Sequence, residues 1–189
     1  TPWTLPSNTA LAVGPNITYY VVKTYNPYTY LPVTVILAKD RFSAYFNPKA
    51  ESLALEDYQA GDKLIPYRKV GEFKGPELEG IRYEQLMPWM RPEGDAFRVI
   101  LGDGTGIVHI APTFGADDDR VAKQAGIAPM LLVDKDGNKQ PMVDKRGRLF
   151  VLEEIDPEFV KSHVNTELYS EYAGRFVKNA YDPQLTEED

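Results

Sequence analysis

The chain has 189 residues, 43% of them apolar, a formal net charge of −7 and a sequence pI near 5.0, values that fit one globular domain with a sizeable core. The acidic balance argues against broad, sequence-independent nucleic-acid binding, which depends on Lys and Arg contacts to phosphates, but it leaves room for a nucleotide or one RNA end. The absence of cysteine excludes disulfides and thiolate zinc sites, and the lack of a membrane-length apolar run or signal-peptide pattern predicts a soluble, cytoplasmic protein with no membrane partner.

Short strands dominate the predicted first half of the chain. The first eight residues, TPWTLPSN, hold two prolines, which argue against a regular helix and favour an extended or turned segment. Helical spacing after an aspartate cap predicts a helix over 40–46, and a weaker pattern suggests another over 51–58. Alternating or β-branched residues predict strands at 9–13, 17–25, 33–38, 63–73, 82–83 and 97–101.

The second half mixes strands, turns and two longer helices. A strand over 105–110 stops at Pro112, and a helix over 117–125 is closed by Gly126. A strand at 130–133 leads into the turn 134–138, which resembles the turn 144–148. A helix is predicted from the Asp156-Pro157 cap to about Tyr172, followed by a strand at 175–178.

Many short strands with few helices between them predict an α/β fold with a strongly bent, largely antiparallel, β-barrel-like core and peripheral helices. No internal repeat or interdomain linker is visible, so the prediction is a single domain over 1–189.

Chemistry-bearing residues gather in the stretch 104–119, which holds three glycines, one of the two histidines and three consecutive aspartates. The predicted strand delivers His109 at its end, and the predicted helix delivers the aspartates at its start, so both can face one pocket. Carboxylates in a first helical turn also complement the helix dipole, and a lone histidine can be a hydrogen-bonded core residue. An ionised aspartate that points into the pocket would instead pair with an ammonium group on a ligand.

Two other enzyme classes find little support. The glycines of 102–106 follow a strand, as in a dinucleotide fingerprint, but the β-branched run after them does not open a helix. This leaves a nicotinamide-type oxidoreductase as a weak alternative. A serine hydrolase of the nucleophile-elbow type lacks its G-x-S-x-G motif.

Two separate stretches resemble the isoleucyl-tRNA synthetases. The first eight residues are similar to the family's threonine-rich peptide, and residues 104–118, GTGIVHIAPTFGADD, are similar to its second editing motif. The valyl and leucyl enzymes have Thr-Arg-Pro in place of Thr1-Pro2-Trp3 and tend to carry Pro-Ala-His-Asp after the glycine motif. The sequences PW at 2–3 and PTFG at 112–115 therefore favour the isoleucyl branch. Weaker matches at 74–80 and 174–180 extend the resemblance over most of the chain.

The resemblance implies the editing domain inserted in the catalytic domain of such a synthetase, a ligase that uses ATP. It implies hydrolysis of the valyl ester of tRNA(Ile), and also of valyl-adenylate, while isoleucine is excluded. The implied partners are the 3′ acceptor end of tRNA(Ile), the small valyl substrate and the rest of the parent synthetase. It implies no metal and no other cofactor. An isolated module that binds an adenylate or acceptor end without turnover is the competing hypothesis.

Individual roles are carried over from the two motifs. Asp118 matches the aspartate that holds the α-ammonium group, and His109 matches the histidine that lines the side-chain pocket. The threonine-rich peptide borders the terminal adenosine and the hydrolytic water, with Trp3 supporting it by packing. The implied catalytic residues are Thr1, Thr4 and Asp118, and the implied substrate-binding residues are Trp3, Asn8, His109 and Asp118.

Two departures from the family pattern limit this expectation. More threonines usually precede the position of Thr1, so the chain is expected to be a fragment whose hydrolytic site is incomplete. The family pattern also has several more residues between Leu101 and Gly104 than this chain.

Overall fold

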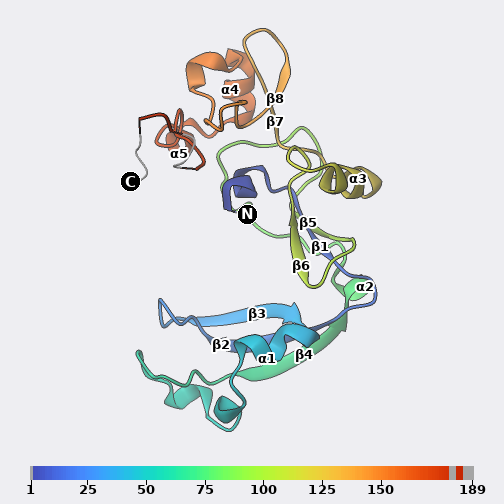
Figure 1. Cartoon of the computed structure of the whole chain (residues 1–189), viewed down its shortest axis with the longest axis vertical. Helices are drawn as coiled ribbons and strands as arrows, with labels where there is room; N and C mark the ends of the chain where they lie inside the picture. Colours follow the sequence, from blue (N-terminus) through green and yellow to red (C-terminus); the bar gives the residue numbers. More distant parts are fainter. Residues whose placement is uncertain (1, 179–181, 185–189) are drawn as a thin grey trace. The chain divides into compact units, whose positions relative to one another are not determined.

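The computed structural model describes residues 2–178 and 182–184, and the chain falls into two compact units (Figure 1). Both units are discontinuous in sequence. The prediction of a single domain stays a prediction. Unit 1 comprises Thr1–Leu11, Arg82–Arg98 and His109–Asp189, and unit 2 comprises Ala12–Ile81 and Val99–Val108.

Unit 2 is organised around an antiparallel sheet with the strand order β3-β2-β4 (Figure 1). Its strands are β2 (Thr18–Tyr25), β3 (Pro32–Ala38) and β4 (Arg68–Lys74). Val22 is fully buried at the centre of the sheet, where it packs in one cluster with Ala50 and Tyr67. The remaining elements of this unit are short: η2 (Lys39–Arg41), α1 (Phe42–Tyr45), η3 (Pro48–Ala50), η4 (Leu55–Asp57) and α2 (Gly75–Leu78).

A second three-stranded sheet has the order β5-β1-β6. The strands are β1 (Ala10–Val13), β5 (Arg98–Leu101) and β6 (Ile107–Ile110). Within unit 1, the Thr9 N–H donates to the Ile110 carbonyl at 3.0 Å, which ties the start of β1 to the end of β6.

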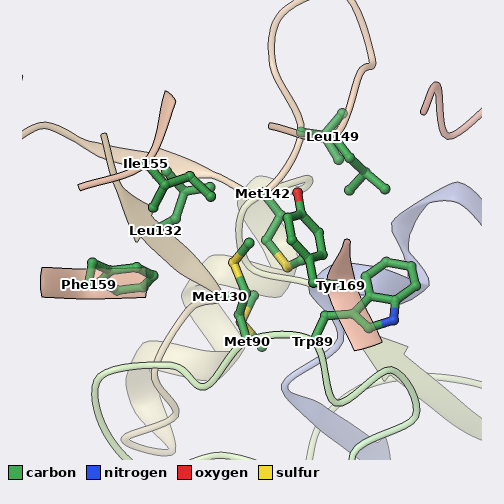
Figure 2. Packing of buried hydrophobic residues seen from close by; sticks show 10 residues of the cluster. Trp89, Met90, Met130, Leu132, Met142, Leu149, Ile155, Phe159 and Tyr169 are labelled. Carbon is green, nitrogen blue, oxygen red and sulfur yellow. The ribbon is translucent and has the colours of Figure 1, made fainter. Parts of the chain in front are cut away.

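The core of unit 1 is a cluster of large apolar side chains. Figure 2 shows Met90 and Met130 in the middle of this cluster, with Phe159 on one side and Tyr169 on the other. Methionine suits such a position because its flexible thioether fills irregular gaps between rigid side chains. The surrounding elements are η1 (Pro2–Ser7), α3 (Ala116–Gln124), β7 (Leu131–Val133), β8 (Lys139–Pro141), η5 (Leu152–Glu154), α4 (Pro157–His163) and α5 (Thr166–Tyr169).

Most predicted strands and turns are confirmed. The predicted turn 134–138 joins β7 to β8 in an antiparallel hairpin, and the Asp144 N–H donates to the Arg148 carbonyl across the second turn. The helix predicted over 40–46 is present as η2 followed by α1, although the Asp40 side chain caps neither of them. The predicted strand over 63–73 begins only after Pro66, as β4.

Five predictions of local structure are wrong. The first residues form the 3-10 helix η1, with Pro6 inside it, instead of an extended segment. The 51–58 helix is reduced to η4. The strands at 82–83 and 175–178 are each reduced to one bridge, between Arg82 and Arg98 and between Phe176 and Arg148. The helix predicted to run to Tyr172 breaks where Val164 is extended and forms a bridge with Met90, after which the Asn165 side chain caps α5.

The predicted barrel-like core is not supported. The described residues form a mixed α/β structure with two three-stranded sheets and one hairpin, and none of these sheets closes into a barrel. Short alternating strands are compatible with either arrangement, since closure depends on pairing between strands that are distant in sequence. None of the helices in the described part of the chain has the length and apolar character needed to span a membrane.

Candidate functional site

The two motifs that lie far apart in the sequence meet in unit 1. The Thr4 hydroxyl oxygen lies 2.7 Å from His109 Nε2, although the two residues are 105 positions apart in the chain. Thr4 lies on helix η1, and His109 lies near the end of strand β6. Thr4 is 9% exposed, so this contact is sheltered from bulk water.

Asn8 is the second partner of His109. Its side-chain nitrogen lies 3.1 Å from His109 Nδ1 and donates to the Ala10 carbonyl at 2.9 Å. Its side-chain oxygen accepts a hydrogen bond from the Tyr83 hydroxyl at 2.6 Å. Both ring nitrogens of His109 therefore contact residues of the N-terminal motif. These two contacts hold the ring in one orientation.

The electrostatic surroundings keep His109 neutral. Burial is the main cause that lowers the pKa of the imidazole below its usual value. The Asp118 carboxylate acts in the opposite direction but does not outweigh burial. A neutral ring can accept a hydrogen bond at one nitrogen and donate at the other, which the imidazolium form cannot do.

We expect His109 to titrate below pH 6.5, the ordinary histidine value, in an NMR titration of the two histidines. Because the folded state then disfavours the proton, His109 stabilises the fold fully above about pH 6.5, and this contribution is lost as the pH falls through the lowered pKa. The loss of unfolding free energy between pH 7.5 and 5.5 should be smaller in His109→Gln, which takes up no proton. A His109 midpoint at or above 6.5 would contradict the assignment.

The three aspartates of helix α3 have different surroundings. Asp118 Oδ2 accepts a hydrogen bond from the Ala111 N–H at 2.8 Å, so this carboxylate turns back from the helix toward the end of β6. Asp117 instead pairs with Arg120 at 3.3 Å and Asp119 pairs with Lys123 at 2.6 Å, both on the outer surface of the helix. Of the three, Asp118 is the one whose carboxylate contacts the segment after β6 and raises the pKa of the His109 imidazole, while its predicted role stays a prediction.

Trp3 and Thr1 are the remaining predicted site residues. Trp3 is 36% exposed, so it is not a core residue, and its ring lies 5.0 Å from the Lys178 ammonium group. This geometry is a cation–π contact. Thr1, predicted as a catalytic residue, lies outside the described residues.

Sequence reasoning missed Tyr83, which belongs to neither motif. Its hydroxyl reaches Asn8, and its ring meets Phe97 edge-on at 6.1 Å. No signal in the sequence distinguishes this tyrosine from the eleven others, because its role depends on a contact across 75 residues. Two buried hydroxyls within the motifs, Ser7 and Thr113, and that of Thr9 beside the first motif have no hydrogen-bond partner among the described residues.

Thr4, Asn8, His109 and Asp118 together are called the His109 cluster. The cavities of the two units do not coincide with it. An open cavity of about 780 Å³ in unit 2 is lined by strand β3, helix α1 and residues 105–108. A smaller one of about 630 Å³ in unit 1 is lined by residues 91–97 with Arg82 and His163. Thr4, Asn8, His109 and Asp118 line neither of them. The Thr4, Asn8 and His109 contacts join residues of both sequence motifs, whereas neither of these two cavities does.

The oxidoreductase alternative loses its structural basis. The glycines of 102–106 lead into strand β6 and not into a helix, so no helix N-terminus is available at this motif for a pyrophosphate. Within residues 2–178 and 182–184, no group of three or more histidine, aspartate or glutamate side chains is placed to hold a metal ion.

Comparisons with known proteins identify the source of the two motifs. No protein-family model matches the chain. Isoleucine–tRNA ligase of Bacteroides fragilis is 62% identical over 100% of this chain and 17% of the ligase. The ligase of Porphyromonas gingivalis is 57% identical over 100% of the chain and 17% of its own length, and that of Cytophaga hutchinsonii is 54% identical over 100% and 16%. The chain thus spans about one sixth of these relatives, and over its whole length it is homologous to one segment of the isoleucine–tRNA ligases.

Proposed function

We propose that the chain is the editing domain of an isoleucine–tRNA ligase and hydrolyses the valyl ester of tRNA(Ile), and also valyl-adenylate. Its partners are then the 3′ acceptor end of tRNA(Ile) and the rest of the synthetase, and the reaction takes place in the cytoplasm without a metal or other cofactor. The homology to a segment of these ligases supports the assignment to the parent enzyme. The net charge of −7 implies that the parent supplies most of the tRNA affinity.

One observation carries the proposal: the Thr4–His109 contact at 2.7 Å joins the two motifs that resemble the editing peptides. Asp118 belongs to the same arrangement, because its carboxylate is hydrogen-bonded to Ala111 and acts on the His109 imidazole. The partnerless hydroxyls of Ser7 and Thr113 lie in the same two stretches, and that of Thr9 directly follows the first. Buried polar groups without partners are uncommon in folded proteins, and a polar ligand or water would satisfy them.

The chemistry required is ester hydrolysis. A water molecule adds to the ester carbonyl, the oxyanion collapses, and the products are valine and the free hydroxyl of the terminal adenosine. Pre-positioned hydrogen-bond donors lower the barrier by stabilising the developing oxyanion, and fixing the ester in place lowers it further. In this proposal the Asp118 carboxylate pairs with the α-ammonium group and positions the ester, while the threonine-rich peptide supplies polar groups near the carbonyl.

A second site is useful because a synthetic pocket cannot reject valine strongly. Isoleucyl-tRNA synthetase is itself the established case of this double-sieve logic, because one missing methylene is in general worth only about 1–3 kcal/mol in a hydrophobic pocket. An editing site reverses the selection: it admits valine and excludes the larger isoleucine by bulk. In this chain the proposed source of that bulk is the His109 ring.

The test combines turnover with binding. Deacylation of valyl-tRNA(Ile) and isoleucyl-tRNA(Ile) is measured with excess chain, and calorimetry measures binding of a non-hydrolysable valyl-adenosine analogue. The proposal predicts hydrolysis of the valyl ester at a rate well above that of the isoleucyl ester. If the chain binds the analogue but does not hydrolyse the ester, it is a binding module and not a deacylase. If it does neither, both hypotheses are refuted.

A further inference from the structure

Four side chains form a continuous polar chain in unit 1, in the order Tyr83, Asn8, His109 and Thr4. The successive separations are 2.6 Å from the Tyr83 hydroxyl to Asn8 Oδ1, 3.1 Å from Asn8 Nδ2 to His109 Nδ1, and 2.7 Å from His109 Nε2 to Thr4 Oγ1. Asn8 and Thr4 are almost fully buried, so their polar atoms depend on these partners more than on bulk water. The donors and acceptors of these hydrogen bonds follow from the chemistry of the groups.

One group next to these four side chains, the Ala10 carbonyl, can only accept a hydrogen bond. Asn8 Nδ2 lies 2.9 Å from the Ala10 carbonyl oxygen, and a carbonyl has no proton to give. The atom facing Ala10 must therefore be the amide nitrogen, since an amide oxygen there would place two acceptors in contact. With the amide fixed in this orientation, its oxygen faces the Tyr83 hydroxyl, which donates to it.

The orientation of Asn8 decides the protonation of His109. The second hydrogen on Asn8 Nδ2 points to His109 Nδ1, so this ring nitrogen must accept and carries no proton. A neutral ring then holds its proton on Nε2, which donates to the Thr4 hydroxyl oxygen. Protonation of Nδ1 would put two donors face to face, so the contacts select one tautomer and oppose the imidazolium form.

Tyr83 is held firmly enough to impose this order. The Tyr83 N–H donates to the Phe97 carbonyl at 3.0 Å, and the Phe97 N–H donates to the Thr9 carbonyl at 2.7 Å, next to Asn8. Phe97 makes this bridge in the left-handed region, with φ of 60°, a conformation that is strained for a non-glycine residue. Burial raises the pKa of the Tyr83 phenol far above its usual range, so the hydroxyl stays a donor at any ordinary pH.

We propose that Tyr83 is a positioning residue of the candidate site: together with the Ala10 carbonyl it holds the Asn8 amide in the orientation that keeps His109 as the neutral Nε2–H tautomer and its ring in one orientation. This inference rests on the proposed function only in its consequence for selectivity. A ring held in one orientation keeps the pocket for the amino-acid side chain at a constant size. The hydrogen-bond order itself is a property of the folded chain and can be measured without substrate.

The test is Tyr83→Phe in the full 189-residue chain, which removes the hydroxyl and keeps the ring against Phe97. With only two histidines, nitrogen-15 NMR resolves each ring, and His163 on helix α4 serves as the internal reference. In the wild type we expect His109 to show an unprotonated Nδ1 and a protonated Nε2. In Tyr83→Phe we expect exchange between tautomers and a titration midpoint raised by roughly half a pH unit or more, the equivalent of one weakened hydrogen bond.

Two further variants keep the result interpretable. Tyr169→Phe removes another buried hydroxyl of unit 1, which donates to the Phe150 carbonyl away from the polar chain, and should leave His109 unchanged. Asn8→Asp replaces the donor facing Nδ1 with a carboxylate, so it should move the proton to Nδ1 and raise the His109 midpoint above 6.5. Unchanged His109 spectra in Tyr83→Phe, or an equal change in Tyr169→Phe, would overturn the proposal, as would a lowered midpoint in Asn8→Asp.

The consequence for selectivity is measured separately. Tyr83→Phe should reduce the ratio of valyl to isoleucyl deacylation on the order of 2- to 10-fold, the range that one hydrogen bond covers. If the wild type does not deacylate, the proposed function fails while the NMR result stands. If the wild type deacylates but the NMR spectra do not change in Tyr83→Phe, the positioning role alone fails.

Discussion

Asp118→Asn is expected to lower the rate of valyl-tRNA(Ile) deacylation on the order of 10- to 100-fold while the fold is retained. The asparagine oxygen can still accept the hydrogen bond from the Ala111 N–H, so the link between helix α3 and the end of β6 survives. The negative charge does not survive, and the α-ammonium group loses its partner. Single-turnover deacylation at saturating enzyme measures the effect, and circular dichroism checks the fold.

Asp118→Ala separates the two roles of this carboxylate. It removes the charge and also the acceptor for the Ala111 N–H, whose loss costs about 1–3 kcal/mol where the group is shielded from water and less at this partly exposed position. Asp117→Asn is the matched control, because it removes a neighbouring charge from the same helical turn but leaves deacylation at the wild-type rate. A fully active Asp118→Asn, or an Asp117→Asn as defective as Asp118→Asn, would contradict the proposed role of Asp118.

His109→Ala is expected to admit isoleucine. Removing the ring opens space for at least one methylene, which a hydrophobic pocket discriminates by about 1–3 kcal/mol, so the preference for the valyl ester should fall roughly 10-fold or more. Deacylation of valyl-tRNA(Ile) and isoleucyl-tRNA(Ile), measured side by side, gives this ratio. The variant also leaves Thr4 and Asn8 without their contacts to the imidazole, so the overall rate should fall as well.

His109→Phe distinguishes bulk from hydrogen bonding. Phenylalanine fills the space of the imidazole but offers neither ring nitrogen, so we expect a slower enzyme that still excludes isoleucine. His163→Ala should change neither rate nor ratio, since His163 contacts Ser162 and stacks on Phe159. Equal discrimination in the wild type and His109→Ala would show that another group sets the size of the pocket.

Local patterns in the sequence predicted strand β6 and helix α3, but not the 3-10 helix η1 that carries Thr4. β-Branched residues before Pro112 indicate strand β6, and Gly126 marks the end of the segment that holds helix α3. The choice of Asp118 among three aspartates comes from the family resemblance, and the structure adds that Asp118 contacts the Ala111 N–H. The catalytic roles of Asp118 and Thr4 and the substrate-binding role of His109 stay predictions.

Long-range pairing is where the sequence was least informative. Nothing near Tyr83 indicates that its hydroxyl reaches Asn8, since that contact depends on the left-handed turn at Phe97. The barrel-like core was inferred from strand number and length, which do not determine how strands pair. The helix break at Val164 likewise follows from its bridge to Met90, a contact that no local pattern shows.

The central claim is that the His109 cluster is the site that receives the valyl ester. A crystal structure of the chain soaked with a non-hydrolysable valyl-adenosine analogue tests it most directly. We predict an α-ammonium group within hydrogen-bonding distance of the Asp118 carboxylate and a valyl side chain against the His109 ring. An analogue bound instead in the cavity of unit 2, away from both residues, would contradict it.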